Sequence, residues 1–125
     1  MLEYQGRFTV FDASRIRTYD LESRPSKVHA EDLASPEALA AAPREFDSDD
    51  LRALVEAIHA ARAREQPVIL LTGAHLIKNG FGPLILDLIR RGLVTLVAMN
   101  AAGMIHDLEF ALIGRTSEGS ERAHV

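Results

Sequence analysis

Residues 67–100 read PVILLTGAHLIKNGFGPLILDLIRRGLVTLVAMN and determine the class of fold. They hold two short apolar runs, residues 67–73 and residues 93–100, neither of which alternates with polar residues. Such runs are typical of strands that are covered on both faces. Residues 83–92 lie between them, with apolar residues at helical spacing. The order strand, helix, strand predicts two parallel neighbouring strands joined by a crossover helix.

Three helices are predicted around these strands. The crossover helix begins near Pro83, whose fixed φ suits the first helical turn. A helix over residues 104–114 follows the second strand and completes a βαβα unit. Upstream, residues 50–65 carry apolar side chains every three or four positions, which predicts an amphipathic helix with Asp47 or Ser48 as its N-cap.

The chain divides into three segments. Residues 1–49 are polar and proline-rich and are predicted to form an N-terminal arm or wrapping segment, with one short helix and an edge strand at residues 7–11. Residues 50–114 form the α/β unit, and residues 115–125 are a polar tail. The predicted fold class is therefore α/β, a partial Rossmann-like parallel sheet with a polar N-terminal arm.

Composition excludes several classes of function. The chain has 125 residues, a net charge of -4 and no cysteine. Without cysteine it has neither disulfides nor a thiol nucleophile, which fits a reducing compartment. The arginines and lysines form no cluster larger than a pair, which argues against nucleic acid as a partner. Because we find neither a secretory signal nor a membrane-spanning run, we expect a cytoplasmic protein that does not bind membranes and acts on a small molecule.

Two glycine-containing segments follow the predicted strands, residues 73–82 and residues 100–103. In parallel sheets the loops at the carboxyl ends of the strands form the ligand crevice. The first segment is longer than most strand-to-helix connections, and long loops are often functional. The spacing of the glycines matches neither the dinucleotide fingerprint nor a P-loop. From local sequence alone, ligand binding and simple turn formation explain them equally well.

Individual polar residues in these segments allow similar alternatives. His75 follows the first strand closely and is expected in a loop, as a ligand contact or as a solvated side chain. Asn100 ends the second strand and can bind a ligand or close a turn. His106 can carry a proton or be structural, and Asp107 suits the first turn of a helix through its charge alone. No histidine pair has the spacing of a metal site, so no metal is predicted.

Residues 73–112 read GAHLIKNGFGPLILDLIRRGLVTLVAMNAAGMIHDLEFAL and resemble a segment of the deoxyhypusine synthase family, most closely its bacterial relatives. That family has a Thr-Ser-Asn loop, a glycine, a helix and a strand that ends in Thr-Ala-Gly-Gly. The resemblance implies a Rossmann-like fold of this NAD-binding type, NAD as the cofactor and a homo-oligomer. The family's best-known member forms a tetramer and transfers an aminobutyl group from spermidine to a protein lysine.

The resemblance also implies site residues. The Ser-Asn positions fall on Ala74 and His75, and the Thr-Ala-Gly-Gly positions fall on residues 100–103. The predicted cofactor-binding residues are Gly73, Ala74, His75, Asn79, Asn100, Ala101, Ala102 and Gly103. His106 is the catalytic candidate, because Ile105, His106 and Asp107 stand where the family has Glu-Glu-Asp. The loss of carboxylates argues against spermidine itself, so the expected substrate is a small molecule such as another amine.

The predicted sheet is too small to form a complete core by itself. Two strands with apolar faces need neighbours, yet residues 115–125 offer no further buried strand. Either the N-terminal half supplies further strands, or partner chains complete the core, or the chain is a shortened piece of a longer protein. We favour the last, with self-association through exposed apolar surface as its consequence. The family's catalytic lysine falls downstream of Val125, so no residue here supplies it. Three functions stay open: an NAD-dependent transferase, a non-catalytic nucleotide-binding module, and an inactive fragment or structural subunit.

Overall fold

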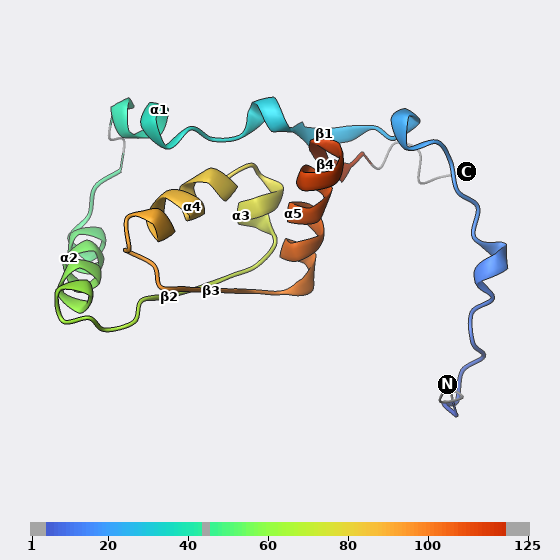
Figure 1. The fold of residues 1–125 in the computed structure, drawn as a ribbon, viewed down its shortest axis with the longest axis horizontal. Helices are drawn as coiled ribbons and strands as arrows, with labels where there is room; N and C mark the ends of the chain where they lie inside the picture. The colour runs from blue at the N-terminus through green and yellow to red at the C-terminus, as the bar shows by residue number, and fades with distance from the viewer. Residues whose placement is uncertain (1–4, 44–45, 120–125) are drawn as a thin grey trace.

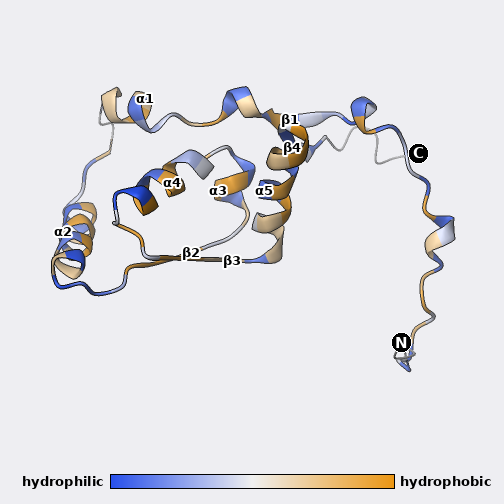
Figure 2. Cartoon of the chain, in the orientation of Figure 1, coloured by the Kyte–Doolittle hydropathy of each residue, from blue (hydrophilic) through white to orange (hydrophobic). Residues whose placement is uncertain are grey.

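The computed structural model describes residues 5–43 and 46–119 and has a mixed α/β architecture (Figure 1). Strands β2 (Ile69–Thr72) and β3 (Leu96–Met99) form a parallel pair, in register from Ile69 opposite Leu96 to Thr72 opposite Met99. The predicted parallel neighbours are thereby confirmed. In Figure 2 both strands are drawn in hydrophobic colours, as the apolar runs of the sequence require.

Helices α3 (His75–Lys78) and α4 (Gly82–Arg90) connect these strands and lie on one face of the sheet (Figure 1). Helix α5 (Ala101–Ile113) follows β3 directly and packs against α3. Among the described residues, the buried apolar side chains are those of Ile77, Ile85 and Val94. The hydrophobic core is therefore small, and it is confined to the helix-covered side of the sheet.

The other face of the β2–β3 sheet is open. Ile69 and Leu71 of β2 and Leu96 of β3 are exposed apolar residues, and no described element covers this face (Figure 1). We expected both faces to be covered, since neither strand alternates with polar residues. The structure places helices on one side alone, so half of the apolar pattern remains without a partner.

A second sheet pairs two distant segments. Strand β1 (Ser26–His29) runs antiparallel to β4 (Arg115–Glu118), with Ser26 opposite Glu118. The prediction of a polar tail from residue 115 is wrong for residues 115–118, and the remainder lies largely outside the described residues. Gly114, at a φ of 66°, ends α5 in the left-handed conformation that favours glycine and lets the chain turn into β4.

Helices α1 (Pro36–Ala41) and α2 (Asp49–Ala63) lie between β1 and β2 in the sequence. The predicted amphipathic helix is confirmed as α2, and its N-cap is Ser48, whose side chain accepts a hydrogen bond from the Leu51 amide at 3.1 Å. Its apolar stripe is not buried, however, because Leu54 and other apolar residues of α2 are exposed. The helix forms, but its apolar face packs little.

The N-terminal residues form an arm that extends away from the sheets (Figure 1). Residues 7–11 do not form the predicted edge strand, because no neighbouring strand pairs with them in the structure. Three short 3-10 turns interrupt the N-terminal segment: Ala13–Arg15, Leu21–Ser23 and Ala30–Asp32. Within the described ranges, no helix is long and apolar enough to span a bilayer.

Candidate functional site

The carboxyl ends of β2 and β3 lie side by side, as the parallel pairing requires. Thr72 pairs with Met99, so the next residues, Gly73 and Asn100, meet at this edge. A Cβ atom built on Gly73 would lie 3.9 Å from Nδ2 of Asn100, which is ordinary van der Waals contact. Both residues are exposed. The two predicted loops therefore converge on one edge of the sheet, which we call the carboxyl edge.

Asn100 also begins the helix that follows. Its Oδ1 accepts a hydrogen bond from the Gly103 amide at 3.1 Å, which makes Asn100 the N-cap of α5. The predicted loop at residues 100–103 is thus wrong in part, because Ala101, Ala102 and Gly103 form the first turn of α5. The N-cap satisfies one amide and leaves other first-turn amides without helical partners.

His75 and Asn79 occupy the two ends of α3 rather than a long loop. His75 begins the helix, Asn79 is its C-cap, and both side chains are exposed. The expected loop over residues 73–82 is therefore wrong, because the single helical turn of α3 interrupts it. Ala74 precedes α3 and is half-buried. Of these residues, Ala74 and His75 lie beside Gly73 in the sequence, whereas Asn79 lies a full helical turn away.

Two glycines of the predicted loops have structural roles that account for them. Gly80 has a φ of 84°, and a Cβ there would lie 3.2 Å from the Asp32 carbonyl oxygen. A Cβ on Gly103 would lie 2.7 Å from Sδ of Met99, so the missing side chain makes room for Met99. A Cβ on Gly82 would meet no atom within 4 Å. Gly73, in contrast, is exposed, and we find no packing constraint on it.

His106 belongs to a different part of the molecule. It lies six residues beyond Asn100, about 9 Å along the axis of α5. Its Nδ1 is 2.7 Å from Oγ1 of Thr116 in β4, and Thr116 in turn donates a hydrogen bond to Glu109. Because the single hydroxyl proton of Thr116 goes to Glu109, Nδ1 of His106 must carry the proton that binds Thr116. The structure therefore does not bring the catalytic candidate to the carboxyl edge.

Glu109 is the centre of this polar network. Arg24 donates a hydrogen bond to its Oε1 at 2.7 Å, and Nδ1 of His106 lies 3.6 Å from its Oε2. Burial raises the pKa of the Glu109 carboxyl, but the hydrogen bonds from Thr116 and Arg24 and the nearby positive charges outweigh burial and leave the pKa below its usual value. Glu109 is therefore held ionised.

The network extends to the N-terminal segment. Arg24 also lies 3.7 Å from Glu118, which accepts a hydrogen bond from Tyr19. Arg115 donates to the Leu21 carbonyl oxygen at 2.9 Å. Sequence reasoning identified His106 but missed Arg24, Glu109 and Thr116, because they come from three segments with no common motif. The polar network ties residues 19–29 to α5 and β4.

A groove of about 870 Å³ lies along β3 and α5. Of the predicted site residues it includes Ala101, together with side chains that are almost all apolar: Val97, Ala98, Met99, Met104, Ile105, Asp107, Leu108 and Ala111. Such a lining suits an apolar segment better than a dinucleotide. We call it the α5 groove.

The candidate site residues therefore fall on two polar features, the carboxyl edge and the partly buried network around Glu109. Among those residues, no three histidine or carboxylate side chains gather as they would around a metal ion. Comparison of the chain with protein-family models, curated proteins and solved structures found no match.

Proposed function

We propose that the chain is a deoxyhypusine synthase-like protein that binds NAD at the carboxyl edge of β2 and β3. The observation that carries this proposal is the meeting of Gly73 and Asn100. The resemblance assigns both segments to the cofactor, and they come from separate parts of the sequence. Ligands of open parallel sheets bind at the carboxyl ends of the strands.

The residues at this edge fit a dinucleotide. Gly73, Asn100, Ala101 and Ala102 are exposed and uncharged, so no carboxylate among them repels a phosphate. The first-turn amides of α5 favour an anionic group, and the absence of a side chain at Gly73 leaves room for a close approach. When bound, NAD would supply hydride transfer. The residues of the chain would bind and orient it.

Binding without turnover is the second candidate function. His106 is engaged with Thr116 and lies about 9 Å along α5 from Asn100. A general base must reach the proton that it removes, and the position of His106 does not support such a role at the carboxyl edge. We infer that a non-catalytic nucleotide-binding module is the alternative to an amine-transferring enzyme.

Isothermal titration with NAD tests the proposal. We expect binding by the parent chain, and a loss of affinity of at least about tenfold in Gly73→Val, because the valine side chain blocks the close approach of the ligand and about 1.4 kcal/mol of lost binding free energy corresponds to tenfold. Gly82→Val is the matched control, because Gly82 lies outside the carboxyl edge and has open space around it. Circular dichroism establishes that each variant folds. If a folded parent chain binds no NAD, or if both variants bind as it does, the proposal is wrong.

His75→Ala tests whether α3, as well as α5, contributes to NAD binding at the carboxyl edge. His75 is exposed at the start of α3, so its removal should leave the fold intact. We expect weaker NAD binding if α3 contributes to the site. Turnover is tested separately, by following NADH absorbance in the presence of small diamines and polyamines. Binding without any NADH formation supports the module, and NADH formation supports the enzyme.

A further inference from the structure

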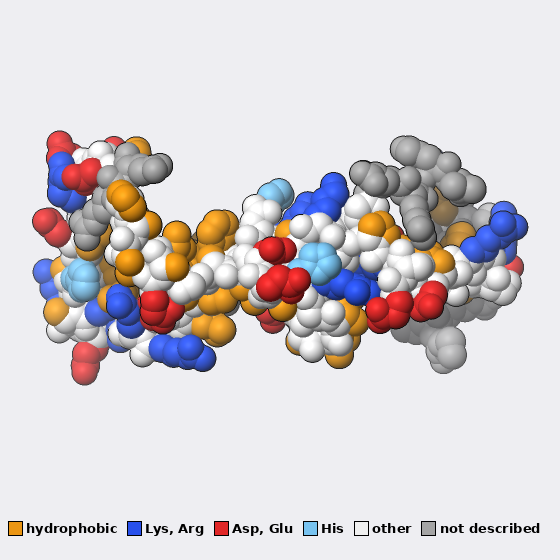
Figure 3. Space-filling model, turned by 90° about the horizontal axis from the view of Figure 1, so that it is seen from above, with side chains coloured by type: hydrophobic (Ala, Val, Ile, Leu, Met, Phe, Trp, Pro, Cys, Tyr) orange, Lys and Arg blue, Asp and Glu red, His pale blue; other side chains and the backbone are white. Residues whose placement is uncertain are grey.

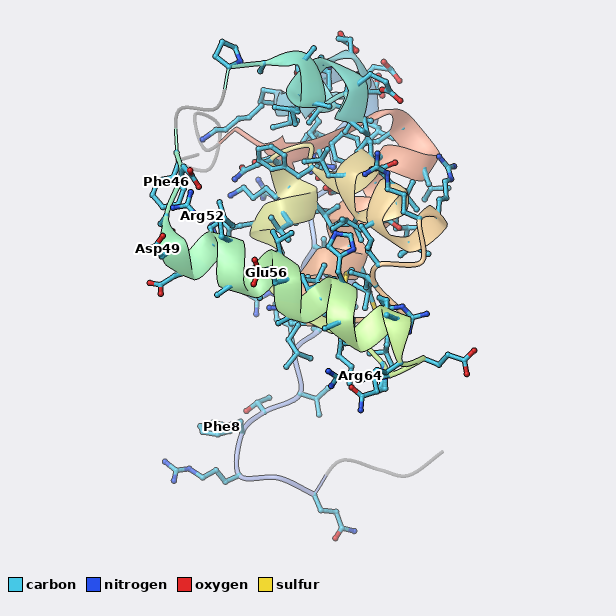
Figure 4. All side chains as sticks on the ribbon, turned by 90° about the vertical axis from the view of Figure 1, so that its left-hand side faces the viewer. Phe8, Phe46, Asp49, Arg52, Glu56 and Arg64 are labelled. Atoms are coloured by element: carbon cyan, nitrogen blue, oxygen red, sulfur yellow. The ribbon has the colours of Figure 1, made fainter. Side chains whose placement is uncertain are left out.

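The N-terminal arm carries apolar side chains that do not pack on the rest of the chain. We define the arm as residues 5–18, because the chain is tied to the polar network from Tyr19 onward. Hydrogen bonds within the arm are local, such as those from Ser14 to Asp12. Its four large apolar side chains are each more than half exposed: Phe8, Val10, Phe11 and Ile16. Figure 4 shows Phe8 on a part of the arm well clear of the helices.

The α5 groove is a second unpartnered apolar surface. Met104 and Leu108 project from α5 and are both more than half exposed. Figure 3 shows further hydrophobic side chains open to solvent to the left of the centre of the molecule. A soluble monomer rarely leaves so much contiguous apolar surface exposed. The chain thus has an extended apolar segment and an apolar groove, each without a partner.

The accessible surface of the chain is larger than that of a compact monomer of the same mass. It measures 10461 Å², whereas a compact monomer of 13.7 kDa exposes about 6,600 Å². The excess, about 3,900 Å², is several times the roughly 800 Å² that each partner buries in a standard interface. The excess therefore exceeds the area that a dimer interface of standard size buries.

We propose that the arm of one copy of this chain lies in the α5 groove of a second copy. Reciprocal exchange of the arms gives a closed twofold dimer, in which each apolar segment covers one groove. The charges agree with this pairing. The arm carries Arg7, Arg15 and Arg17 against a single carboxylate, Asp12, whereas the charged residue that lines the groove is Asp107.

The arm leaves the body at the β1–β4 sheet and extends away from it (Figures 1 and 4). The hydrogen bonds of Tyr19 and Arg24 fix the point at which it leaves. A second copy can therefore receive the arm without disturbing the polar network. The α5 groove meets the carboxyl edge at Ala101, but trapping of the arm and titration with NAD are separate measurements, so either proposal can fail without the other.

Disulfide trapping tests the proposal, because the parent chain has no cysteine. Chains carrying Phe11→Cys are mixed with differently sized, tagged chains carrying Leu108→Cys and mildly oxidised. We expect a covalent dimer that contains one chain of each kind. Leu54→Cys on α2 is the matched control, since Leu54 and Leu108 are both 57% exposed. The yield with Leu108→Cys should exceed that with Leu54→Cys several-fold.

Light scattering of the unmodified chain provides an independent measurement. We expect the mass of a dimer for the parent, and a shift toward the monomer for Phe8→Ser with Phe11→Ser, whose positions are exposed in the single chain. A monomeric parent overturns the proposal. So does equal trapping at Leu54 and Leu108. An intrachain disulfide in dilute Phe11→Cys/Leu108→Cys shows that the arm folds back on its own groove, and also overturns it.

Discussion

The side-chain amide nitrogen of Asn100 lies 3.9 Å from the position that a Cβ atom on Gly73 would take. This proximity follows from the parallel pairing, which brings the ends of β2 and β3 together at the carboxyl edge. The other side-chain atom of the same amide, Oδ1, caps α5 through the Gly103 amide. Asn100 therefore connects the proposed ligand site to the stability of a helix, and substitutions can separate the two roles.

Asn100→Asp should keep stability and lose NAD affinity. Aspartate is as good an N-cap as asparagine, and its charge suits a helix N-terminus. The same charge replaces an amide donor and repels a phosphate. Asn100→Ala should instead cost about 1 kcal/mol of unfolding free energy through loss of the cap. Urea denaturation measures the stability, and calorimetric titration measures the NAD affinity. Full NAD affinity in Asn100→Asp would show that the phosphates of NAD do not bind at this edge.

Gly103→Ala should destabilise the fold by crowding Met99. The new Cβ would lie 2.7 Å from Sδ and 3.3 Å from Cγ of Met99, and overpacking of this kind costs about 1–3 kcal/mol. Gly82→Ala is the control, because its new Cβ would meet nothing within 4 Å. Urea denaturation should show a lower midpoint for Gly103→Ala and an unchanged or higher one for Gly82→Ala. Equal midpoints would mean that Met99 moves aside freely.

Gly80→Ala should cost more stability than Gly92→Ala. Both glycines have left-handed φ values, 84° and 68°, and that conformation costs an alanine about 1–2 kcal/mol. Gly80 has a second constraint, because its Cβ would press on the Asp32 carbonyl oxygen at 3.2 Å, whereas Gly92 has open space. The difference between the two variants in thermal unfolding therefore measures how tightly residues 30–34 pack. No difference would show that this packing is weak.

Periodicity and end signals predicted the central part of the fold. The apolar runs around Leu70 and Val97 correctly predicted two parallel strands. The residues at the ends of α4 and α5 predicted these helices. The signals are local, and they depend on side-chain patterns that one segment contains. The helix boundaries moved by a few residues, because Asn100 caps α5 earlier than the glycine at 103 suggested.

The pairing of β1 with β4 could not be predicted in the same way. Both strands are polar, and their burial comes from hydrogen bonds such as those of Thr116 rather than from hydropathy. Arg24 and Glu109 are 85 residues apart in the sequence, and no motif relates them. For the same reason, the sequence suggested His106 as a catalytic residue without indicating that Thr116 and Glu109 would engage it.

Thr116→Val should destabilise the β1–β4 sheet by about 1–3 kcal/mol. Thr116 is fully buried, and valine of the same shape leaves the partly buried partners His106 and Glu109 without their hydrogen bonds. Thr116→Ser keeps the hydroxyl and should retain most of the stability. Hydrogen exchange of the β4 amides measures the local effect. If Thr116→Ser and Thr116→Val lose protection equally, the methyl group rather than the hydroxyl stabilises the sheet.

Glu109→Gln should remove part of the acid sensitivity of the fold. Burial raises the pKa of Glu109, but the hydrogen bonds from Thr116 and Arg24 and the neighbouring charges lower it further, so the folded pKa lies below its ordinary value. The pKa of a glutamate in an unfolded chain is about 4.3. The stabilisation by ionised Glu109 is therefore fully present above that pH and is lost as the pH falls through the folded pKa.

The parent should consequently be more stable than Glu109→Gln at neutral pH, and the difference should shrink below about pH 4. Urea denaturation of both chains between neutral and acid pH measures it. Glu22→Gln is the control, because Glu22 is a highly exposed partner of Arg115, and surface ion pairs contribute little. A constant difference between the parent and Glu109→Gln at every pH would show that packing of the side chain, rather than its charge, stabilises the network.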